Sequence, residues 1–264
     1  MTQHLKNKTV LVTGASSGIG KSIAVEIARE GGNLVLLARN EGKLKELTNH
    51  LQDEWRIAVS YYRCDVSNRE DVHHVFQRMK EEGVRIDALI NNAGFGVFED
   101  VMETDLTSFQ SMFDVNVLGL IQCVKEVLPS MLSRGTGHIV NIASQAGKIS
   151  TPKSSGYAAT KHAVLGFTNS LRLEVQHKGV YVTAVNLGPV RTNFFDTADP
   201  DGTYTQSVER WMLDPDRVAR TVVRHLFKRK REINLPTWME LGSKVYQLMP
   251  GVVEAMFAKQ FRKK

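Results

Sequence analysis

The sequence has few cysteines and no long uninterrupted apolar run. Cys64 and Cys123 are its two cysteines, and neither belongs to a CxxC or Cys/His spacing that would indicate a metal site. No stretch reaches the ~18 consecutive apolar residues that a membrane-spanning helix requires. The first strand-like run begins by Thr9, which leaves no room for a signal segment before it. We therefore expect two buried free thiols, no metal and a cytoplasmic protein.

Most of the chain also lacks an excess of charge of either sign. Residues 1–227 contain 25 Lys and Arg against 25 Asp and Glu, whereas residues 228–264 contain 9 against 3, a difference that accounts for the whole formal charge of +6. A nucleic-acid-binding protein is expected to carry a basic face on its folded body. Because this body is neutral, we expect no nucleic-acid partner.

Apolar, β-branched runs alternate with helix-like stretches through most of the chain. The strand candidates are residues 9–13, 34–38, 57–62, 86–91, 138–142, 181–186 and 233–235. The helical patterns between them are residues 19–30, 43–54, 71–82, 108–133, 156–177 and 216–228. Most strand candidates are continuously hydrophobic, which is typical of parallel strands covered on both faces. The alternation predicts a Rossmann-type, doubly wound parallel sheet of seven strands in a three-layer α/β sandwich.

A glycine-rich turn follows the first strand candidate and precedes an amphipathic helix. It contains Gly14, Ser16, Ser17, Gly18, Ile19 and Gly20. Glycines in such a turn let backbone N–H groups and a helix N-terminus approach a pyrophosphate closely. The strand-turn-helix context favours a nucleotide site over a plain tight turn.

The second strand candidate ends at Ala38-Arg39-Asn40, without an acidic residue. A dinucleotide site usually has a carboxylate there that accepts hydrogen bonds from the ribose hydroxyls. Arg39 can instead pair with a 2′-phosphate, and the missing carboxylate removes a repulsive group. The pattern favours NADP over NAD, with a solvated surface arginine as the alternative.

Tyr157 and Lys161 form a Y-x-x-x-K pair, which on a helix places a phenol and an ammonium group on one face. A free tyrosine titrates near ~10, and a nearby cation favours its phenolate form. We therefore expect Lys161 to lower the pKa of Tyr157 and make proton transfer feasible. Because the motif is common on ordinary helices, its weight depends on the motifs around it.

Together these motifs resemble the short-chain dehydrogenase/reductase family, in the family's order and over residues 6–236. The further matching pieces are Cys64-Asp65-Val66, Asn91-Asn92-Ala93-Gly94, Asn116 within residues 114–117, Ser144, and residues 186–192. The chain departs from the family at its usual Pro-Gly pair, which reads Leu187-Gly188-Pro189 here. We expect this departure to alter the rigidity of a loop and not the chemistry.

The resemblance implies NADP-dependent reduction of a ketone or aldehyde, or the reverse oxidation, by hydride transfer. It implies that Tyr157 donates a proton to the substrate oxygen, Ser144 polarises that oxygen, Lys161 holds the nicotinamide ribose, and Asn116 anchors a water in a proton relay. The cofactor contacts that it implies, beyond the glycine turn and Arg39, are Asp65, Val66, Asn92, Ala93, Gly94, Tyr157, Lys161, Pro189, Val190 and Thr192.

The resemblance does not supply the substrate. The expected substrate contacts are Phe95, Ser144, Gln145, Tyr157 and Phe194. Residues 190–215, where the family has its substrate loop, contain Phe194, Phe195, Tyr204 and Trp211, and these aromatic side chains favour an apolar carbonyl compound. One alternative is a 3-oxoacyl-carrier-protein reductase, although those proteins normally end soon after the last strand. A remote alternative is a non-catalytic NADP-sensing protein, which can dispense with the Ser, Tyr or Lys. In the family the long helices at residues 108–133 and 156–177 pair across subunits, which implies a homodimer or homotetramer.

Residues 1–236 are expected to form the NADP-binding catalytic domain, and residues 237–264 a helical tail of the same domain. Apolar residues recur in the tail at spacings of three and four, at Leu241, Val245, Leu248, Met249, Val252, Met256 and Phe257. Pro250-Gly251 should divide the tail into two helices. We expect the apolar stripe to pack over the substrate pocket or against a second subunit. The alternative is weak contact with an anionic membrane surface, because Lys259, Arg262, Lys263 and Lys264 cluster at its end.

Overall fold

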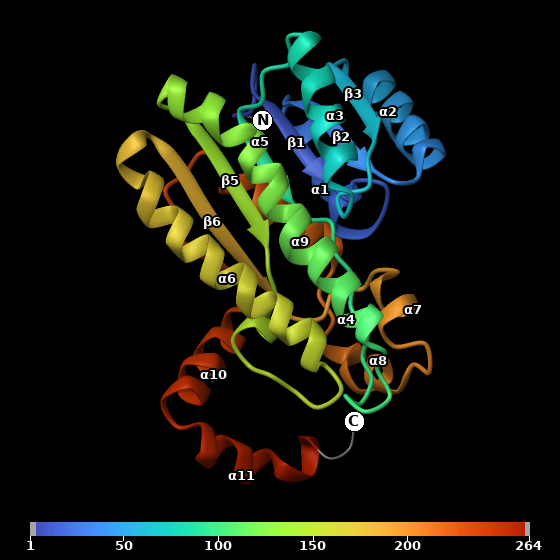
Figure 1. The fold of residues 1–264 in the computed structure, drawn as a ribbon, viewed down its shortest axis with the longest axis vertical. Coiled ribbons are helices and arrows are strands. Elements are labelled where there is room, and N and C mark those ends of the chain that lie inside the picture. The colour runs from blue at the N-terminus through green and yellow to red at the C-terminus, as the bar shows by residue number, and fades with distance from the viewer. Residues whose placement is uncertain (1–3, 262–264) are drawn as a thin grey trace.

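A seven-stranded sheet runs through the centre of the molecule (Figure 1). The structure is a computed structural model that describes residues 4–261, and their side chains to residue 256. All six pairs of neighbouring strands are parallel, in the order β3-β2-β1-β4-β5-β6-β7. The strands are β1 Thr9–Thr13, β2 Asn33–Ala38, β3 Val59–Arg63, β4 Ala88–Asn91, β5 Gly137–Ile142, β6 Val180–Leu187 and β7 Glu232–Leu235. The predicted Rossmann-type sheet is confirmed.

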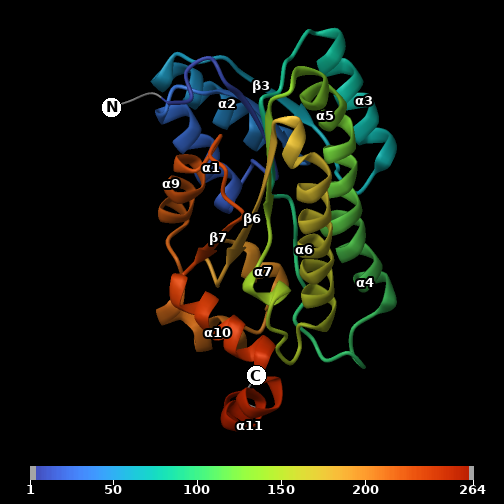
Figure 2. The ribbon, with the colours of Figure 1, turned by 90° about the vertical axis from the view of Figure 1, so that its left-hand side faces the viewer.

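Helices cover both faces of the sheet (Figure 2). One layer holds α1 Gly18–Arg29, α2 Glu41–Trp55 and α9 Pro215–Arg224, and the other holds α3 Arg69–Glu81, α5 Leu120–Arg134 and α6 Ser155–Val175. The two cores explain why the three central residues of β1 are all apolar. Val10 and Val12 belong to the core on the α1 side, whereas Leu11 between them belongs to the core on the α5 side.

The strand order places a crevice at one edge of the sheet. The chain winds from β1 outward to β3, then returns to β4 on the other side of β1 and winds outward to β7. Ligands in such sheets bind beyond the carboxyl ends of the strands, at the point where the winding reverses. The loops after β1 and β4 meet at that point.

The helix expected at residues 108–133 has an irregular turn in its middle. Helix α4, Leu106–Phe113, continues through a π-helical turn at Asp114–Gly119 into α5. A Cβ added at Gly119 would lie 2.4 Å from the carbonyl oxygen of Val66, so this close contact requires glycine. Among the described residues, the whole span Leu106–Arg134 is the helix long and apolar enough to cross a membrane. Because its buried side chains, such as Val124, pack against the sheet, it is a core helix here.

The segment between β6 and α9 contains more helix than was predicted. It forms α7 Phe194–Ala198, α8 Thr203–Val208 and a 3₁₀ turn at Glu209–Trp211. The Asp199 carboxylate stabilises the start of α8 by accepting hydrogen bonds from the backbone N–H groups of Tyr204 and Thr205. These hydrogen bonds form only when the chain turns between Asp199 and Tyr204, and hydrophobic periodicity in the sequence does not indicate such a turn.

The tail forms two helices, α10 Thr237–Leu248 and α11 Pro250–Phe261, so the predicted break at Pro250 is confirmed. The expectation that its apolar stripe packs over the pocket is wrong. The exposed fractions are 68% for Leu241, 83% for Leu248 and 71% for Met256. The opposite side of α10 faces the protein instead, where Ser243 is buried and Met239 contacts the loop after β6.

Several tail residues of the prediction are not described. The side chains of Phe257 and Lys259 lie outside the described side chains, and Arg262, Lys263 and Lys264 lie outside the described residues. Elsewhere, Cys64 and Cys123 are free and buried, as predicted. Within the described residues no group of His, Cys, Asp or Glu side chains is arranged to hold a metal ion.

Candidate active site

A cavity of about 790 Å³ lies beyond the carboxyl ends of the strands. Its lining includes nearly all of the predicted site residues. The lining residues that were predicted are Gly14, Ser16, Ser17, Gly18, Ile19, Arg39, Asp65, Val66, Asn92, Ala93, Gly94, Phe95, Ser144, Gln145, Tyr157, Lys161, Pro189, Val190, Thr192 and Phe194. Gly20 and Asn116 are predicted site residues that do not line the cavity. The winding of the sheet therefore brings together residues that lie up to 180 positions apart in the sequence.

The glycine turn forms one end of the cavity. Gly14 and Gly18 have φ angles of +64° and +52°, in the left-handed region that favours glycine. The side chain of Ser17 makes no capping hydrogen bond to the start of α1. The first N–H groups of α1, together with the positive end of its dipole, are therefore available to an anion.

Gly20 has a packing role and not a lining role. A Cβ at this position would lie 2.3 Å from the carbonyl oxygen of Gly14 and 2.6 Å from Nδ2 of Asn92. The absence of a side chain thus lets helix α1 approach the turn. The predicted contact of Gly20 with the cofactor stays a prediction beside this packing role.

The segment after β4 is tied to the glycine turn by hydrogen bonds. Nδ2 of Asn92 donates to the carbonyl oxygens of Thr13 and Gly14, at 3.0 and 3.3 Å. The Thr13 hydroxyl in turn accepts from the backbone N–H groups of Asn92 and Ala93, both at 3.0 Å. These bonds hold the two loops at the crevice in a fixed relation, so the cavity wall is rigid here.

Arg39 lies exposed at the rim of the cavity, directly after β2. It makes no ion pair with any of the described residues. The neighbouring Asn40 caps α2, because its side-chain oxygen accepts a hydrogen bond from the N–H of Lys43. The guanidinium group is therefore free to bind a phosphate.

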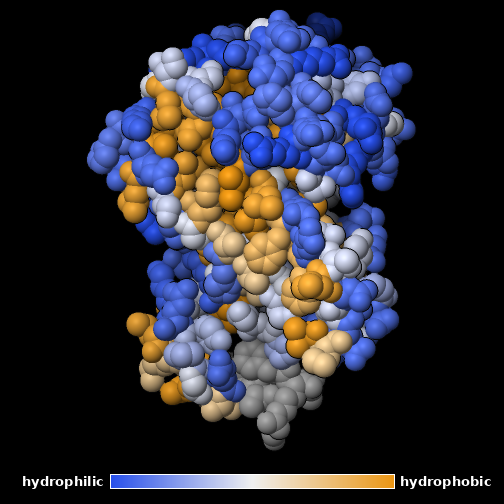
Figure 3. Space-filling view, viewed as in Figure 1, coloured by the Kyte–Doolittle hydropathy of each residue, from blue (hydrophilic) through white to orange (hydrophobic). Residues whose placement is uncertain are grey.

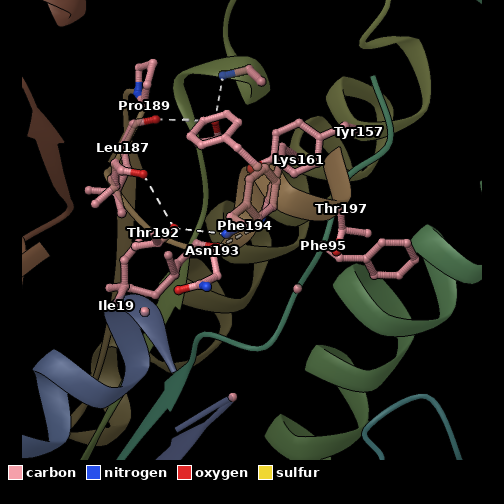
Figure 4. A pocket seen from close by; sticks show the side chains of 18 of the residues that line it. Ile19, Phe95, Tyr157, Lys161, Leu187, Pro189, Thr192, Asn193, Phe194 and Thr197 are labelled. Carbon is pink, nitrogen blue, oxygen red and sulfur yellow. Dashed lines mark hydrogen bonds between the residues drawn. The ribbon is translucent and has the colours of Figure 1, made fainter. Parts of the chain in front are cut away.

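Ser144, Tyr157 and Lys161 all line the cavity, and Figure 4 shows Tyr157 and Lys161 side by side. Burial raises the pKa of Tyr157 to about 12, and a hydrogen bond with Ser144 acts in the opposite direction. Ser144 Oγ also lies 3.3 Å from the Leu187 carbonyl oxygen, to which it donates, and accepts from the N–H of Ala146 at 3.1 Å. The phenol is thus neutral at physiological pH, and Ser144 is held beside it.

The expectation that Lys161 lowers the pKa of Tyr157 is not met. Lys161 Nζ donates to the carbonyl oxygen of Ile142 at 3.0 Å and lies 5.6 Å from the centre of the Tyr157 ring. Burial lowers the pKa of Lys161 to about 8. The Lys161 ammonium group is thus directed at a backbone carbonyl oxygen and not at the phenol oxygen. Burial therefore has the largest effect on the pKa of Tyr157.

Asn116 lies in the π-helical turn and supports the site through three hydrogen bonds. Its Nδ2 donates to the Phe95 carbonyl oxygen at 2.8 Å and to the Thr160 hydroxyl at 3.1 Å, and its Oδ1 accepts from the Phe95 N–H at 3.0 Å. Both amide hydrogens are used in this way. Asn116 therefore positions Phe95 and the residue before Lys161, while the water relay implied for it stays a prediction.

Aromatic side chains form the other end of the cavity. The Phe98 ring centre lies 5.7 Å from that of Tyr157 and 5.0 Å from that of Tyr204, and the Phe194 ring centre lies 5.5 Å from that of Tyr157. Figure 4 shows the Phe194 ring against Tyr157. The sequence analysis missed Phe98, which follows the Asn-Asn-Ala-Gly motif by four residues and offered no signal beyond its aromatic character.

A buried polar cluster supports the turn that carries Ser144. Gln145 Nε2 donates to the Asn186 carbonyl oxygen at 3.2 Å. Asn186 Nδ2 donates to Asn234 Oδ1 at 2.8 Å, and Lys148 Nζ donates to the same oxygen at 3.0 Å and to Glu232 at 2.5 Å. Strand β7 is thereby connected to the turn after β5 that holds Ser144.

Comparisons with known proteins agree with this geometry. A family model for the short chain dehydrogenases matches residues 8–202. An uncharacterized oxidoreductase of Staphylococcus saprophyticus is 38% identical over 83% of this chain and 91% of its own length. Dehydrogenase/reductase SDR family member 7B of Xenopus laevis is 33% identical over 87% of this chain and 74% of its own length.

Solved structures with the same fold contain a nicotinamide cofactor. A short-chain dehydrogenase from Sphingobium yanoikuyae in complex with NADPH has a TM-score of 0.80 and 32% identity, over 92% of this chain and 96% of that one. A variant of actinorhodin polyketide ketoreductase with NADPH has a TM-score of 0.79 and 29% identity, over 86% of this chain and 95% of that one.

Proposed function

The chain belongs to the short-chain dehydrogenase family, and from this premise we propose that it is an NADP(H)-dependent reductase of apolar ketones or aldehydes, or a dehydrogenase of the corresponding alcohols. The observation that carries the proposal is the position of Tyr157. Its phenol lies in one cavity with the glycine turn on one side and the aromatic side chains on the other. A proton donor at that point can serve a substrate placed between the two.

The residues of the glycine-turn end fit a dinucleotide phosphate. The N-terminus of α1 would hold the pyrophosphate, because no side chain caps its first N–H groups. Gly14 and Gly18 keep the turn open there, since a side chain at either position would be strained by the positive φ angle. Arg39 would bind a 2′-phosphate, since it is exposed at the rim and carries no competing ion pair among the described residues. NADP rather than NAD is therefore the cofactor we propose.

The bound cofactor would supply the hydride, while the protein supplies orientation and the proton. Tyr157 is neutral at physiological pH because burial raises its pKa to about 12. It can therefore donate its proton to the substrate oxygen as negative charge develops there. Ser144 Oγ, held by the Leu187 carbonyl oxygen and the Ala146 N–H, lies beside the phenol and would orient the same oxygen.

Lys161 would act as a fixed donor beside Tyr157. Its ammonium group is held by the Ile142 carbonyl oxygen, within a cavity wall braced by Asn116 through the neighbouring Thr160. In that position it can hold a ribose hydroxyl and keep a positive charge close to the developing phenolate. Its lowered pKa, about 8, makes this charge sensitive to mildly alkaline pH.

The aromatic end of the cavity supports an apolar substrate. Phe98 and Phe194 contact the Tyr157 ring, with ring centres 5.7 and 5.5 Å from its own. Phe195 and Tyr204 extend the cluster through ring contacts with Phe98 and with each other. Burial of a substrate against these rings would exclude water and add the stabilisation of aromatic contacts. The similarity to a polyketide ketoreductase supports a second candidate function, which is the reduction of a 3-oxoacyl group on a carrier protein.

A homodimer through α5 and α6 would cover an exposed apolar face. Leu118 and Leu173 are 57% and 62% exposed, and apolar atoms form a band across these helices in Figure 3. The band lies on the far side of the sheet from α1 and α9. Subunit pairing there would leave the mouth of the cavity open.

The test is a survey of carbonyl compounds with the purified protein. Consumption of NADPH and of NADH is followed with aliphatic, aromatic and charged ketones and aldehydes and with a 3-oxoacyl thioester on a carrier protein. We expect turnover with NADPH and an apolar carbonyl compound, and none with the Tyr157→Phe variant. Turnover with the carrier-bound thioester alone would favour the second candidate, and NADPH binding without any turnover would favour a sensor.

A further inference from the structure

Helix α10 has an inner side that packs on the protein and an opposite, outer side that is apolar and exposed. On the inner side, Ser243 is buried and Met239 lines the cavity. On the outer side, Trp238, Leu241, Val245 and Leu248 fall within about 80° of one another at 3.6 residues per turn. Their exposed fractions run from 45% to 83%. The inner side accounts for the packing of the helix on the protein, so the described residues leave the apolar outer side uncovered.

Helix α11 extends this outer surface. Val252 and Met256, one turn apart, are 49% and 71% exposed. The Tyr246 hydroxyl donates to Glu254 at 2.9 Å, which joins the two helices. We call the six side chains of Trp238, Leu241, Val245, Leu248, Val252 and Met256 the apolar foot. Figures 1 and 2 both place α10 and α11 together at one end of the molecule, and Figure 3 shows apolar atoms there among polar ones.

The segment that carries the apolar foot is basic. Residues 237–264 contain five Lys and Arg against two Asp and Glu, and four of the five bases fall in residues 259–264. The two acids are both engaged, because Glu240 pairs with Lys244 at 3.0 Å and Glu254 accepts from Tyr246. Residues 1–227, in contrast, carry equal numbers of acids and bases. An exposed apolar face and an uncompensated positive charge therefore occur in the same short segment.

We propose that the apolar foot docks on an anionic lipid surface. Amphipathic helices with apolar side chains on one side and lysines nearby bind in the headgroup region, where the cations meet lipid phosphates. Tryptophan is favoured at that depth. The ring centre of the half-exposed Trp211 lies 5.9 Å from that of Trp238, so a second tryptophan extends the surface.

A second copy of the chain is a poorer occupant. A symmetric pair would bring the same surface of each subunit together, and the basic segments would then face each other. Like charges at an interface oppose association. The exposed residues of α5 and α6 also provide a separate apolar face for pairing. A lipid surface satisfies both the apolar side chains and the charge.

Docking has a consequence for the cavity. Met239, on the inner side of α10, lines the cavity, and Trp211 belongs to the same segment as Phe194 and Tyr204, which also line it. Docking would therefore hold the cavity close to the lipid, where apolar carbonyl compounds dissolve. This consequence rests on the proposed function, whereas the docking itself does not.

The experiment measures sedimentation of the full-length protein with vesicles. One set of vesicles contains equal parts of phosphatidylglycerol and phosphatidylcholine, and the other contains phosphatidylcholine alone. We expect binding to the anionic set at low salt, and a loss of at least about tenfold near 0.5 M salt, where the Debye length falls below 5 Å. Bromine-labelled lipid should quench the tryptophan fluorescence of the bound protein, and it should quench less after Trp238→Phe. Trp55, which lies outside the tail, contributes the unquenched background fluorescence.

Matched variants separate lipid docking from other causes. Leu241→Glu with Leu248→Glu should weaken vesicle binding by at least about tenfold, because two apolar side chains become charged. Asn49→Glu with His50→Glu is the control, because it adds the same number of carboxylates at exposed positions of α2, at the other end of the molecule in Figure 1, and it should keep vesicle binding. NADPH affinity is measured on every variant to verify folding, and it should not change.

Two results would overturn the proposal. The first is absence of binding to the anionic vesicles at low salt. The second is a smaller oligomer for Leu241→Glu with Leu248→Glu in solution, with vesicle binding unaffected, which would make the apolar foot an interface between copies. Vesicle binding by a protein that reduces no carbonyl compound would leave docking established and the proposed function wrong.

Discussion

The two ends of the cavity are built in different ways. The glycine-turn end depends on backbone, through left-handed glycines, a helix N-terminus and hydrogen bonds from Asn92 to main-chain oxygens. The aromatic end depends on side chains, which meet from the loop after β4, helix α6 and the segment between β6 and α9. Backbone geometry tolerates little change, whereas a cluster of rings can be repacked. One end is thus suited to a constant ligand and the other to a variable one.

Tyr157 lies between the two ends, and its loss should have the largest effect. Tyr157→Phe removes the proton donor and little volume, so kcat should fall by about 10²–10⁴-fold while NADPH affinity stays within a factor of about two. Tyr204→Phe, which removes a hydroxyl from the aromatic end alone, is the matched control and should keep most of the activity. Steady-state kinetics and NADPH titration measure both. A Tyr157→Phe variant with more than a tenth of the original kcat would contradict the assignment.

The protonation of Tyr157 should make the two directions of reaction respond differently to pH. Reduction needs the neutral phenol, which a pKa of about 12 preserves up to pH 9. Oxidation needs the phenolate, whose fraction rises tenfold per pH unit below the pKa. The rate of alcohol oxidation should therefore rise about tenfold from pH 7 to pH 8, and less steeply above pH 8, where Lys161 loses the charge that favours the phenolate. An oxidation rate that stops rising below pH 7 would contradict this prediction. It would mean that the bound cofactor and Lys161 lower the pKa of Tyr157.

The glycine-turn end should be intolerant of a single methyl group. In Gly20→Ala the new Cβ would meet the Gly14 carbonyl oxygen at 2.3 Å, so α1 must shift. We expect the free energy of unfolding to fall by about 1–3 kcal/mol and NADPH affinity to fall with it. Gly166→Ala is the control, because Gly166 lies exposed within α6 with nothing within 4 Å of its added Cβ, and it should gain about 0.5–1 kcal/mol. Thermal unfolding with and without NADPH distinguishes these outcomes.

The sequence predicted the glycine-turn end far better than the aromatic end. The seven strands, the left-handed turn and the residues after each strand follow from local patterns, because each strand must bury both faces and each loop must leave at the same edge. Phe98 was missed, since a loop side chain is placed by whichever other loops meet it. Its backbone N–H donates to Ala198, about 100 residues away. Such a contact has no local signature.

Helix α10 and Lys161 illustrate two further limits. The apolar stripe of the tail was predicted to pack over the pocket or against a second subunit, yet the side of α10 that packs on its own chain carries Met239 and Ser243. A hydrophobic pattern identifies an apolar face but not the surface that covers it. The Y-x-x-x-K spacing placed Lys161 on the same side as Tyr157 correctly, but the direction of its ammonium group depends on the Ile142 carbonyl oxygen, which no spacing reveals.

At the rim of the glycine-turn end, one charge should decide between cofactors. Arg39→Asp replaces an attractive group by a repulsive one, and a charge-assisted hydrogen bond contributes roughly 1.5–3 kcal/mol. The preference for NADPH over NADH should therefore fall by about 10- to 150-fold or invert. Arg63→Asp, which alters an exposed arginine at the end of the neighbouring β3 but outside the cavity lining, is the control. Equal kcat/KM values for NADPH and NADH in the unmutated protein would contradict the cofactor assignment.

A change at the aromatic end should be the mildest, and it should affect the substrate alone. Phe98→Leu removes ring contacts with Tyr157, Phe194 and Tyr204 but keeps the site apolar. An aromatic pair contributes about 0.5–1.5 kcal/mol beyond its area, so KM for an aromatic carbonyl substrate should rise about 2- to 13-fold. NADPH affinity should not change, because Phe98 is far from the glycine turn in the wall of the cavity. Phe113→Leu, partly exposed at the end of α4 and outside the cavity, should leave both constants unaltered. If Phe98→Leu weakened NADPH and substrate equally, the two ends of the cavity would not be independent, and the contrast between a backbone-built and a side-chain-built end would have no functional meaning.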